Sequence, residues 1–232
     1  MATPQPWLSV VIAARNERER LPALLAQLAH QSLLVREVLV VDGGSSDGTE
    51  QLARLAGARL LRCAPGRGRQ LALGAREAQG PWLLLLHADV RLPPDWAPRV
   101  GRARGRRSGV VWYFDLAIGN RHPALRLVEG AVALRSRLRQ LPYGDQGLLL
   151  PLAHYRACGG IRPIPLMEDL DLVQRLRRRG RLLSLGTALQ VDGRRWRQRG
   201  IWTTTLSNAR LRRAWRRGED PEALARRYYG TP

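Results

Sequence analysis

The stretch VLVVDGGSSDGTEQLARLAG, residues 38–57, decides the fold class of this chain. It begins with four apolar residues, three of them β-branched, which are typical of a strand buried on both faces. An aspartate and two glycines follow, and these residues favour a turn over a continued strand. The leucines and alanines after Thr49 predict a helix that ends near Ala56. The stretch is therefore expected to form one strand-loop-helix unit of an α/β protein.

Similar units precede and follow this stretch. Strands are expected at Leu8–Ala14, Val38–Val41, Ala58–Cys63 and Trp82–Leu86. Three helices are expected between them. The first carries Leu21, Leu24, Leu25 and Leu28, the second ends near Ala56, and the third spans Arg69–Ala78. Such alternation favours right-handed βαβ connections. We expect a mixed, mainly parallel sheet with helices on both faces.

The second half of the chain has a less regular pattern. Strands are expected at Gly109–Ile118 and Gly147–Leu152, and helices at Pro123–Leu141, Asp169–Arg179 and Pro221–Tyr229. From Arg194 to Gly218 the chain contains nine arginines and three tryptophans. Because no low-complexity linker interrupts the pattern, we expect a single domain over residues 1–232 that ends in a basic tail, residues 194–232.

The composition narrows the possible partners and the compartment. The formal net charge is +20, every basic residue is an arginine, and such a charge attracts nucleic acid, anionic lipid and phosphorylated ligands. Two cysteines without a CxxC pair predict neither a disulfide framework nor a zinc site. The start lacks the pattern of a signal peptide, and no apolar run is long enough to span a membrane. We therefore expect a cytoplasmic protein, for which contact with a membrane surface stays open.

Polar residues follow three of the predicted strands. Asn16 and Glu17 come after the first strand, Asp42 after the second, and His87 and Asp89 after the fourth. Each could simply form a turn or cap a helix. However, ligands of open α/β sheets bind beyond the carboxyl ends of the strands. On a chain with 39 basic and 19 acidic residues, acidic groups gathered at that edge favour a binding site.

Four motifs, taken in order, resemble the family 2 glycosyltransferases of the GT-A fold: SVVIAARNE, VVDGGSSDGT, LLLLHAD and MEDLDLVQRLRRRG. The resemblance runs over nearly the whole chain. GRGRQLALGA, YGDQGLLL and RRWRQRG are similar to the branch described as arsenosugar-biosynthesis, or radical-SAM/selenodomain-associated, glycosyltransferases. The resemblance implies a GT-A (Rossmann-like) fold in which residues 1–118 bind a nucleotide sugar and residues 119–193 bind the acceptor and carry catalysis.

The resemblance also implies a donor site and a metal site. Asn16, Glu17 and Asp42 match positions that bind the nucleoside, and Asp89 matches the metal-binding aspartate. His87 stands where the family more often has a second aspartate. The implied cofactor is a divalent metal, Mg or Mn, and an imidazole ligand suits Mn better than Mg. His87 could instead support the metal site indirectly or only be hydrogen-bonded at the strand end.

Arginines are candidates for the donor diphosphate. Arg67 and Arg69 precede a predicted helix, so both could pair with phosphate oxygens near its N-terminus. A solvated turn is the alternative. Arg194, Arg195 and Trp196 resemble the family's arginine-tryptophan motif near the diphosphate, although Asp192 stands where that motif usually has a glutamine.

Asp169 matches the family's catalytic base, Glu168 is its neighbour, and Asp171 is the nearby alternative for the same role. In an inverting transfer such a carboxylate takes the proton of the acceptor hydroxyl. Tyr143, Asp145 and Gln146 lie just before a predicted strand and are expected to line the acceptor site, unless they form an ordinary turn.

The resulting expectation is an enzyme that moves a sugar from a nucleotide-diphosphate-sugar donor to an acceptor hydroxyl, with inversion and a divalent metal. The acceptor would be a small molecule or a lipid-linked compound. A sugar nucleotidyltransferase is the alternative enzyme, but the chain has no Gly-rich loop directly after its first strand. A nucleic-acid-binding module would explain the charge, but not the acidic loops.

The basic tail allows two interpretations. Arginines together with Trp196, Trp202 and Trp215 suit an interfacial segment on an anionic membrane. A solvated charged face with the tryptophans packed inward fits the sequence equally well.

Overall fold

The computed structural model describes residues 5–106 and 109–230. The strands are β1 (Leu8–Ala14), β2 (Val35–Asp42), β3 (Arg59–Arg62), β4 (Trp82–His87), β5 (Val90–Arg91), β6 (Val111–Ile118), β7 (Leu148–Pro151) and β8 (Leu182–Val191). The helices are α1 (Leu21–Ala29), α2 (Thr49–Leu55), α3 (Arg67–Glu77), α4 (Trp96–Arg104), α5 (Pro123–Arg139), α6 (Leu152–Ala157), α7 (Glu168–Arg177), α8 (Arg194–Arg199), α9 (Ile201–Arg216) and α10 (Pro221–Tyr229), with a short 3-10 turn η1 (Gly144–Gln146).

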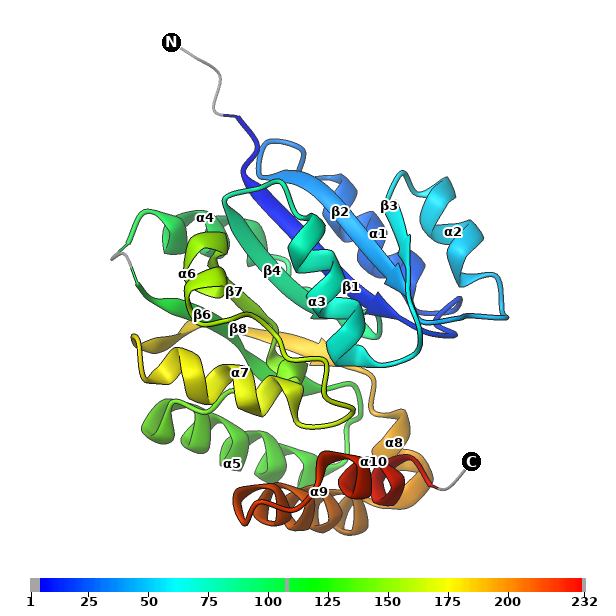
Figure 1. Ribbon diagram of the computed structural model, residues 1–232, viewed down its shortest axis with the longest axis vertical. Coiled ribbons are helices and arrows are strands. Elements are labelled where there is room, and N and C mark those ends of the chain that lie inside the picture. The colour runs from blue at the N-terminus through cyan, green and yellow to red at the C-terminus, as the bar shows by residue number, and fades with distance from the viewer. Residues whose placement is uncertain (1–4, 107–108, 231–232) are drawn as a thin grey trace.

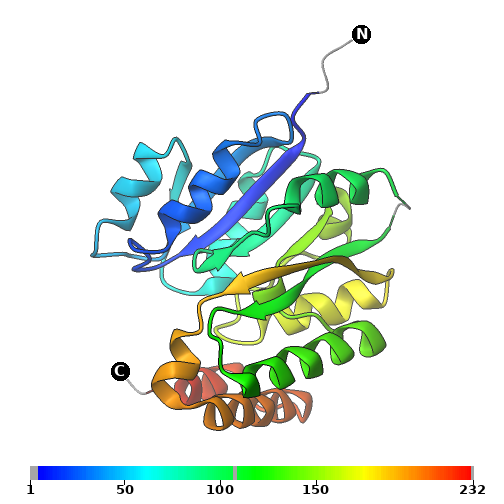
Figure 2. The same cartoon turned by 180° about the vertical axis from the view of Figure 1, so that it is seen from behind.

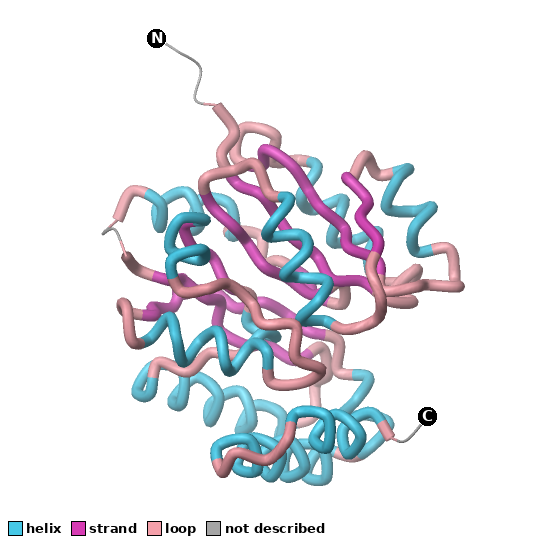
Figure 3. Tube along the Cα trace, viewed as in Figure 1, coloured by secondary structure: helices cyan, strands magenta, loops and turns pink. Residues whose placement is uncertain are grey.

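All eight strands form one sheet in the order β3-β2-β1-β4-β7-β6-β8-β5, with helices on both faces (Figures 1 and 3). β1 lies between β2 and β4 and is parallel to both. β7 runs antiparallel to its neighbours β4 and β6, whereas β8 is parallel to β6. The predicted mixed, mainly parallel α/β sheet is confirmed.

The strands of the first half read as continuous apolar runs because both of their faces are covered. In β1, Val10 and Ile12 pack into the cluster that contains the leucines of α1, and Val11 packs into the cluster on the opposite face, which includes Leu71 of α3. All three β1 side chains are fully buried. Burial on both faces explains why the strands show no alternation of polar and apolar residues.

The second half contains elements that the sequence analysis did not predict. The longest strand among these is β8, whose burial changes from residue to residue and whose Gly186 has a left-handed φ of 72°. A strand of this kind gives no continuous apolar run, so its pattern was missed. α4, α6 and the two-residue β5 were also not predicted. The basic tail forms α8, α9 and α10, of which only α10 was predicted.

α3 is held closely against the sheet edge that carries the polar loops. The buried Gln70 side chain donates from Nε2 to the carbonyl oxygens of Ala14 (2.7 Å) and Val41 (2.8 Å), at the ends of β1 and β2. One turn further along α3, a Cβ on Gly74 would lie 2.3 Å from Val11 Cγ1. The close approach of α3 thus depends on a glycine, and it places the first residue of α3, Arg67, at the sheet edge.

None of the helices within residues 5–106 and 109–230 is long and apolar enough to cross a membrane.

We expect Gly74→Ala to destabilise the protein by about 1–3 kcal/mol, because the added methyl group overpacks the contact between α3 and β1. Urea unfolding measures the change. Gly101→Ala in α4 is the matched control, since a Cβ there meets no atom within 4 Å. This control should be neutral or stabilising by about 0.5 kcal/mol, and a Gly74→Ala variant as stable as the control would contradict the packing argument.

Candidate functional site

A cavity of about 460 Å³ opens where β4, η1 and α7 meet the three C-terminal helices. Its wall combines five segments that are far apart in the chain. One part of the lining comes from Arg67 of α3, His87 and Asp89 at the end of β4, Tyr143 and Asp145 at η1, and Met167 and Asp169 at the start of α7. The C-terminal helices supply a second part: Arg194 to Trp196, Gln198 and Arg199 of α8, Asn208, Leu211 and Arg212 of α9, and Tyr228 and Tyr229 of α10. Several of the motifs that looked separate in the sequence therefore face one cavity.

Asp169 is fixed by backbone groups on both of its oxygens. Oδ2 accepts a hydrogen bond from Gly144 N and Oδ1 accepts one from Leu170 N, each 2.8 Å long. Burial raises the pKa of Asp169, but the nearby Arg67, these two hydrogen bonds and His87 outweigh it and leave the pKa below its usual value. The carboxylate is consequently ionised at neutral pH and held in one orientation.

Arg67 and Glu168 form a buried ion pair directly behind Asp169. Arg67 Nε donates to Glu168 Oε1, and Arg67 Nη2 lies 3.8 Å from Asp169 Oδ2. Glu168 is 1% exposed, and burial raises its pKa even though Arg67 acts in the opposite direction. Burial by itself would lower the pKa of Arg67, but the negative charges of Glu168 and Asp169 outweigh burial and raise the pKa above its usual value. Glu168 thus lies outside the cavity wall, and its carboxylate faces Arg67.

His87 ends β4 with a free ring nitrogen. Within the described part of the chain, its buried Nε2 has no hydrogen-bond partner. Burial and the neighbouring Arg67 lower the pKa of His87 from 6.5 to about 4, against the opposite effect of Asp89 and Asp169. At neutral pH the imidazole is thus uncharged, which is the form that binds metals.

Gly144 keeps the space between His87 and Asp169 open. A Cβ at this position would lie 3.1 Å from Asp169 Oδ2 and 3.2 Å from His87 Nε2. Any larger residue would therefore crowd both side chains.

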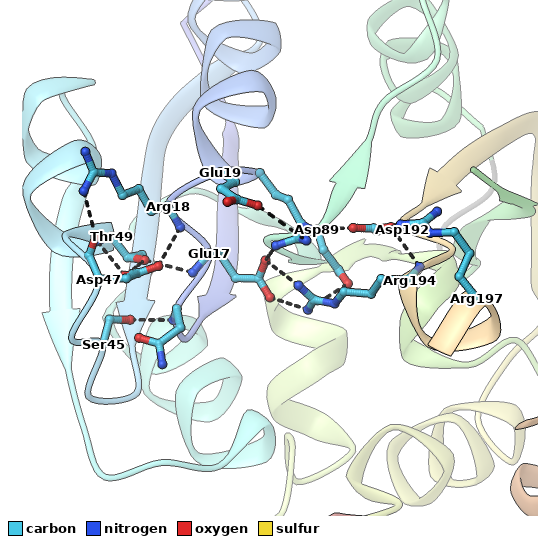
Figure 4. A network of polar contacts seen from close by, with 12 residues as sticks. Glu17, Arg18, Glu19, Ser45, Asp47, Thr49, Asp89, Asp192, Arg194 and Arg197 are labelled. Carbon is cyan, nitrogen blue, oxygen red and sulfur yellow. Dashed lines mark hydrogen bonds and ion pairs between the residues drawn. The ribbon is translucent and has the colours of Figure 1, made fainter. Parts of the chain in front are cut away.

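Asp89 belongs to a chain of charges that joins the first-strand loop to α8 (Figure 4). Arg194 Nη2 lies 2.6 Å from Glu17 Oε1 and 3.6 Å from Asp89 Oδ2. Arg20 pairs with Asp192, which also accepts a hydrogen bond from the backbone N of Arg194 at 2.9 Å. Burial raises the pKa of Glu17 more than Arg194 lowers it. Arg20 and Asp192 were not among the predicted binding residues. Arg194 belongs to the predicted RRW motif, but only the turn of α8 decides that this arginine of the motif faces the acids.

Arg195 and Trp196 also line the cavity, but the guanidinium of Arg195 is engaged by α10. Its Cζ lies 3.7 Å from the ring centroid of Tyr228, and Nη2 donates to the Tyr228 carbonyl oxygen at 3.4 Å. Trp196 is half-buried and packs against the hydrophobic core. Both residues thus tie the C-terminal helices to the cavity.

The predicted acceptor residues divide into two groups. Tyr143 and Asp145 line the cavity, and the Tyr143 ring contacts the guanidinium groups of Arg135 and Arg212 at 3.8 and 5.2 Å. Burial raises the pKa of Asp145, although Arg135 opposes this. Gln146, by contrast, is fully buried.

The side chain of Gln146 holds η1 in place and does not reach the cavity. It donates to the Phe114 carbonyl oxygen at 3.1 Å and accepts from Ser136 Oγ at 2.9 Å. The prediction that Gln146 lines the acceptor site is therefore wrong, because its polar atoms are bonded inside the protein. Arg69 is exposed on α3 and is likewise absent from the cavity wall.

Asn16 and Asp42 shape neighbouring loops outside the cavity. Asp42 has no exposed surface, and its Oδ2 accepts hydrogen bonds from Gly44 N and Ser45 N at 2.8 Å. In this arrangement it lacks the exposed oxygen that a direct bond to a nucleoside requires, so the turn interpretation describes it better. Asn16 is exposed, with a left-handed φ of 54°, and its Oδ1 accepts from Ser46 N at 2.9 Å.

Residues 9–120 match the family described as Glycosyl transferase family 2. A 4,4'-diaponeurosporenoate glycosyltransferase of Staphylococcus haemolyticus is 38% identical over 93 residues, covering 37% of this chain and 24% of the relative. An undecaprenyl-phosphate 4-deoxy-4-formamido-L-arabinose transferase of Aeromonas hydrophila is 35% identical over 115 residues, covering 45% and 35%. These matches support a family 2 glycosyltransferase. The chain spans only about a quarter to a third of the length of these two relatives.

Solved structures share the fold over most of the chain. S. aureus TarS 1-349 matches with a TM-score of 0.67 at 16% identity, covering 81% of this chain and 60% of the other. The glucosyl-3-phosphoglycerate synthase of Mycobacterium tuberculosis, in complex with Mn²⁺, UDP and glucosyl-3-phosphoglycerate, matches with a TM-score of 0.58 at 21% identity, covering 78% and 71%. The predicted GT-A fold is confirmed.

The pKa of His87 gives the metal-free protein a specific pH dependence. Between pH 6.5 and about 4 the unfolded chain binds a proton at His87 that the folded chain does not bind. The free energy of unfolding of the wild type therefore falls as the pH is lowered through this range. Asn does not titrate, so we expect the free energy of unfolding of His87→Asn to fall by about 2 kcal/mol less than that of the wild type over the same range.

Urea unfolding in a chelator, from pH 7 downward, measures this difference. His30→Asn is the control, because His30 is exposed and should leave the wild-type pH dependence unchanged. Equal pH slopes for His87→Asn and the wild type would show that the environment of His87 is not as described.

Proposed function

We propose that the chain transfers a sugar from a nucleotide-diphosphate-sugar donor to an acceptor hydroxyl with inversion. The observation that carries the proposal is that Asp169, oriented by two backbone N–H groups, shares one cavity with Asp89 and His87. The family match supports the same reaction class. Residues 1–118 as the donor half and 119–193 as the acceptor half remain predictions.

Asp169 is proposed as the base. As the acceptor oxygen forms its bond to the anomeric carbon, Asp169 takes the hydroxyl proton and the nucleoside diphosphate leaves from the opposite side. Arg67 keeps the carboxylate ionised before the reaction, and Glu168 keeps Arg67 in place. The two backbone donors fix the carboxylate so that no reorientation is needed during proton transfer.

Asp89 and His87 are proposed to hold a divalent metal. Across the described residues, no group of three or more His, Cys, Asp or Glu side chains could hold an ion without help. Two protein ligands suit a cation that is otherwise bound by donor phosphates and water. The unpartnered, neutral His87 nitrogen fits such a site and favours Mn over Mg. The metal would supply positive charge to the departing diphosphate.

The acceptor is proposed to be a small molecule or a lipid-linked compound that carries an acidic group. Arg195, Arg199 and Arg212 line the cavity, and no carboxylate oxygen of the described residues lies within 4.0 Å of their guanidinium nitrogens. Such arginines suit a phosphate or carboxylate. The relative from Aeromonas hydrophila has an undecaprenyl-phosphate acceptor in its name, and a structural neighbour was solved with phosphoglyceric acid. Membership of the branch described as arsenosugar-biosynthesis, or radical-SAM/selenodomain-associated, glycosyltransferases and a cytoplasmic location belong to this proposal as well.

We expect Asp169→Asn to lower sugar transfer at least about a thousandfold, because the amide cannot accept the proton, while donor binding stays within about threefold of the wild type. Transfer of isotope-labelled sugar to a panel of phosphorylated acceptors and their neutral counterparts measures the first quantity. Calorimetry with the donor measures the second.

Asp171→Asn is the matched control on the same helix. Asp171 pairs with Arg162 and Arg175 outside the cavity, so its loss should affect stability more than transfer. Normal turnover of Asp169→Asn would contradict its assignment as the base.

A second experiment tests the metal. A thermal-shift panel of nucleoside diphosphates should show stabilisation that requires Mn or Mg, and Asp89→Asn should weaken binding about tenfold or more. His87→Asp replaces the nitrogen ligand by oxygen and should move the preference from Mn towards Mg. Equally tight nucleoside diphosphate binding in a chelator would contradict the metal site.

A further inference from the structure

The solvent-facing side of α5 carries a stripe of apolar side chains between exposed arginines. Three leucines on it are largely exposed: Leu127 (68%), Leu134 (61%) and Leu138 (74%). Pro123, Gly130 and Ala131 are exposed as well. Apart from the adjacent Gly130 and Ala131, these positions are three or four residues apart, so they form one stripe along the helix.

The buried side of α5 faces the other way. Leu125, Val128 and Ser136 are its buried residues. The apolar stripe thus lies on the side of α5 that faces away from the core, and its side chains are not part of the core. Exposed apolar patches of this size on a folded protein mark a surface that is covered by something else.

α9 continues this surface on the neighbouring helix. α5 and α9 pack against each other and lie side by side at one end of the molecule (Figures 1 and 2). On α9 the exposed side begins with Trp202 (60%) and Leu206 (54%) and continues with arginines. Five of the eight large apolar side chains that are exposed in the described residues belong to these two helices.

The charges on both helices are positive. The exposed arginines are Arg126, Arg137 and Arg139 on α5 and Arg210, Arg213 and Arg216 on α9, whereas Arg135 and Arg212 face Tyr143 on the inner side. Arg137 is paired with Asp115 at 2.8 Å. Glu129, the one acidic residue of the two helices, is already paired with Arg126 at 3.0 Å. Apolar side chains flanked by arginines are the composition of a segment that lies on an anionic membrane surface.

Two other occupants fit less well. A second copy of the chain would place one set of arginines opposite another, and such like-charge contacts oppose association. A nucleic acid would attract the arginines but leave the leucines in water. We propose that the outer faces of α5 and α9 bind the surface of an anionic lipid bilayer.

The structure also changes which tryptophans can take part. Trp196 and Trp215 pack against the buried clusters, so of the three tail tryptophans only Trp202 is largely exposed. The membrane contact is therefore centred on α5 and the first half of α9 and not on the basic tail as a whole. The other side of α9, with Asn208 and Arg212, lines the cavity, so a bound bilayer lies one helix away from it.

Vesicle sedimentation tests the proposal. The probes are vesicles of phosphatidylcholine and of an equimolar mixture of phosphatidylcholine and phosphatidylglycerol. The wild type should bind the mixed vesicles and bind the neutral ones far less, with binding that weakens as salt is added. The triple variant Leu127→Gln, Leu134→Gln, Leu138→Gln keeps every charge and should bind the mixed vesicles about tenfold or more weakly.

Leu33→Gln with Leu55→Gln is the matched control, because these leucines are equally exposed (74% and 76%) but lie away from α5 and α9. This variant should bind like the wild type. A Trp202→Gln, Leu206→Gln variant provides a second test of the same surface. Circular dichroism confirms that each variant is folded, as expected for exposed positions.

Three results would overturn the proposal. If the triple variant binds mixed vesicles as tightly as the wild type, the attraction is only the general charge of the chain. If the wild type does not bind them, the surface is not a membrane surface. If there is no vesicle binding and sedimentation equilibrium shows a dimer that the triple variant dissociates, the surface joins two copies. None of these readouts depends on sugar transfer, so they are separate from a failure of the proposed reaction.

Discussion

The buried ion pair between Arg67 and Glu168 connects the two halves of the sheet at the site. Arg67 begins α3, which packs against the parallel strands, and Glu168 begins α7, which belongs to the second half. Since Glu168 is almost without solvent contact, its charge depends on Arg67, and loss of Arg67 would leave an uncompensated buried carboxylate. The same arginine lowers the pKa of both neighbours, His87 and Asp169. One pair thus sets the relative position of α3 and α7 and the protonation of the groups proposed for the chemistry.

A second group of charged residues, around Asp89, also joins segments that are far apart in the sequence. Arg194 contacts Glu17 and lies near Asp89, so the first-strand loop, the fourth-strand loop and α8 are held together. In a chain with a net charge of +20, carboxylates are scarce, and those at the site have arginine neighbours. A donor diphosphate offers the same arginines a stronger anionic partner. Under the proposed function, the arrangement is suited to exchanging protein carboxylates for phosphate oxygens of the donor.

The C-terminal helices have two different sides. α9 contributes Asn208, Leu211 and Arg212 to the cavity, whereas its outer side carries Trp202 and Leu206. A segment that looked like a uniform basic tail is thus both a wall of the site and an outer surface. Its arginines have distinct neighbours: Arg195 stacks on Tyr228, and Arg212 lies over Tyr143.

The sequence by itself determined the α/β class, the first four strands and the GT-A resemblance, because strands buried on both faces and their following turns leave strong local patterns. It also indicated Asp169, Asp89 and His87, which follow or begin regular elements. Only the tertiary structure decided that Gln146 is internal and that the Asp42 carboxylate accepts hydrogen bonds within its own loop. It also decided that Glu168 pairs with Arg67 and that Arg194 faces the acids. It also supplied β8, whose uneven burial follows from its place in the sheet. The physical reason is the same in each case: a side chain's partners and exposure depend on elements distant in sequence, and a local pattern of residue types does not contain that information.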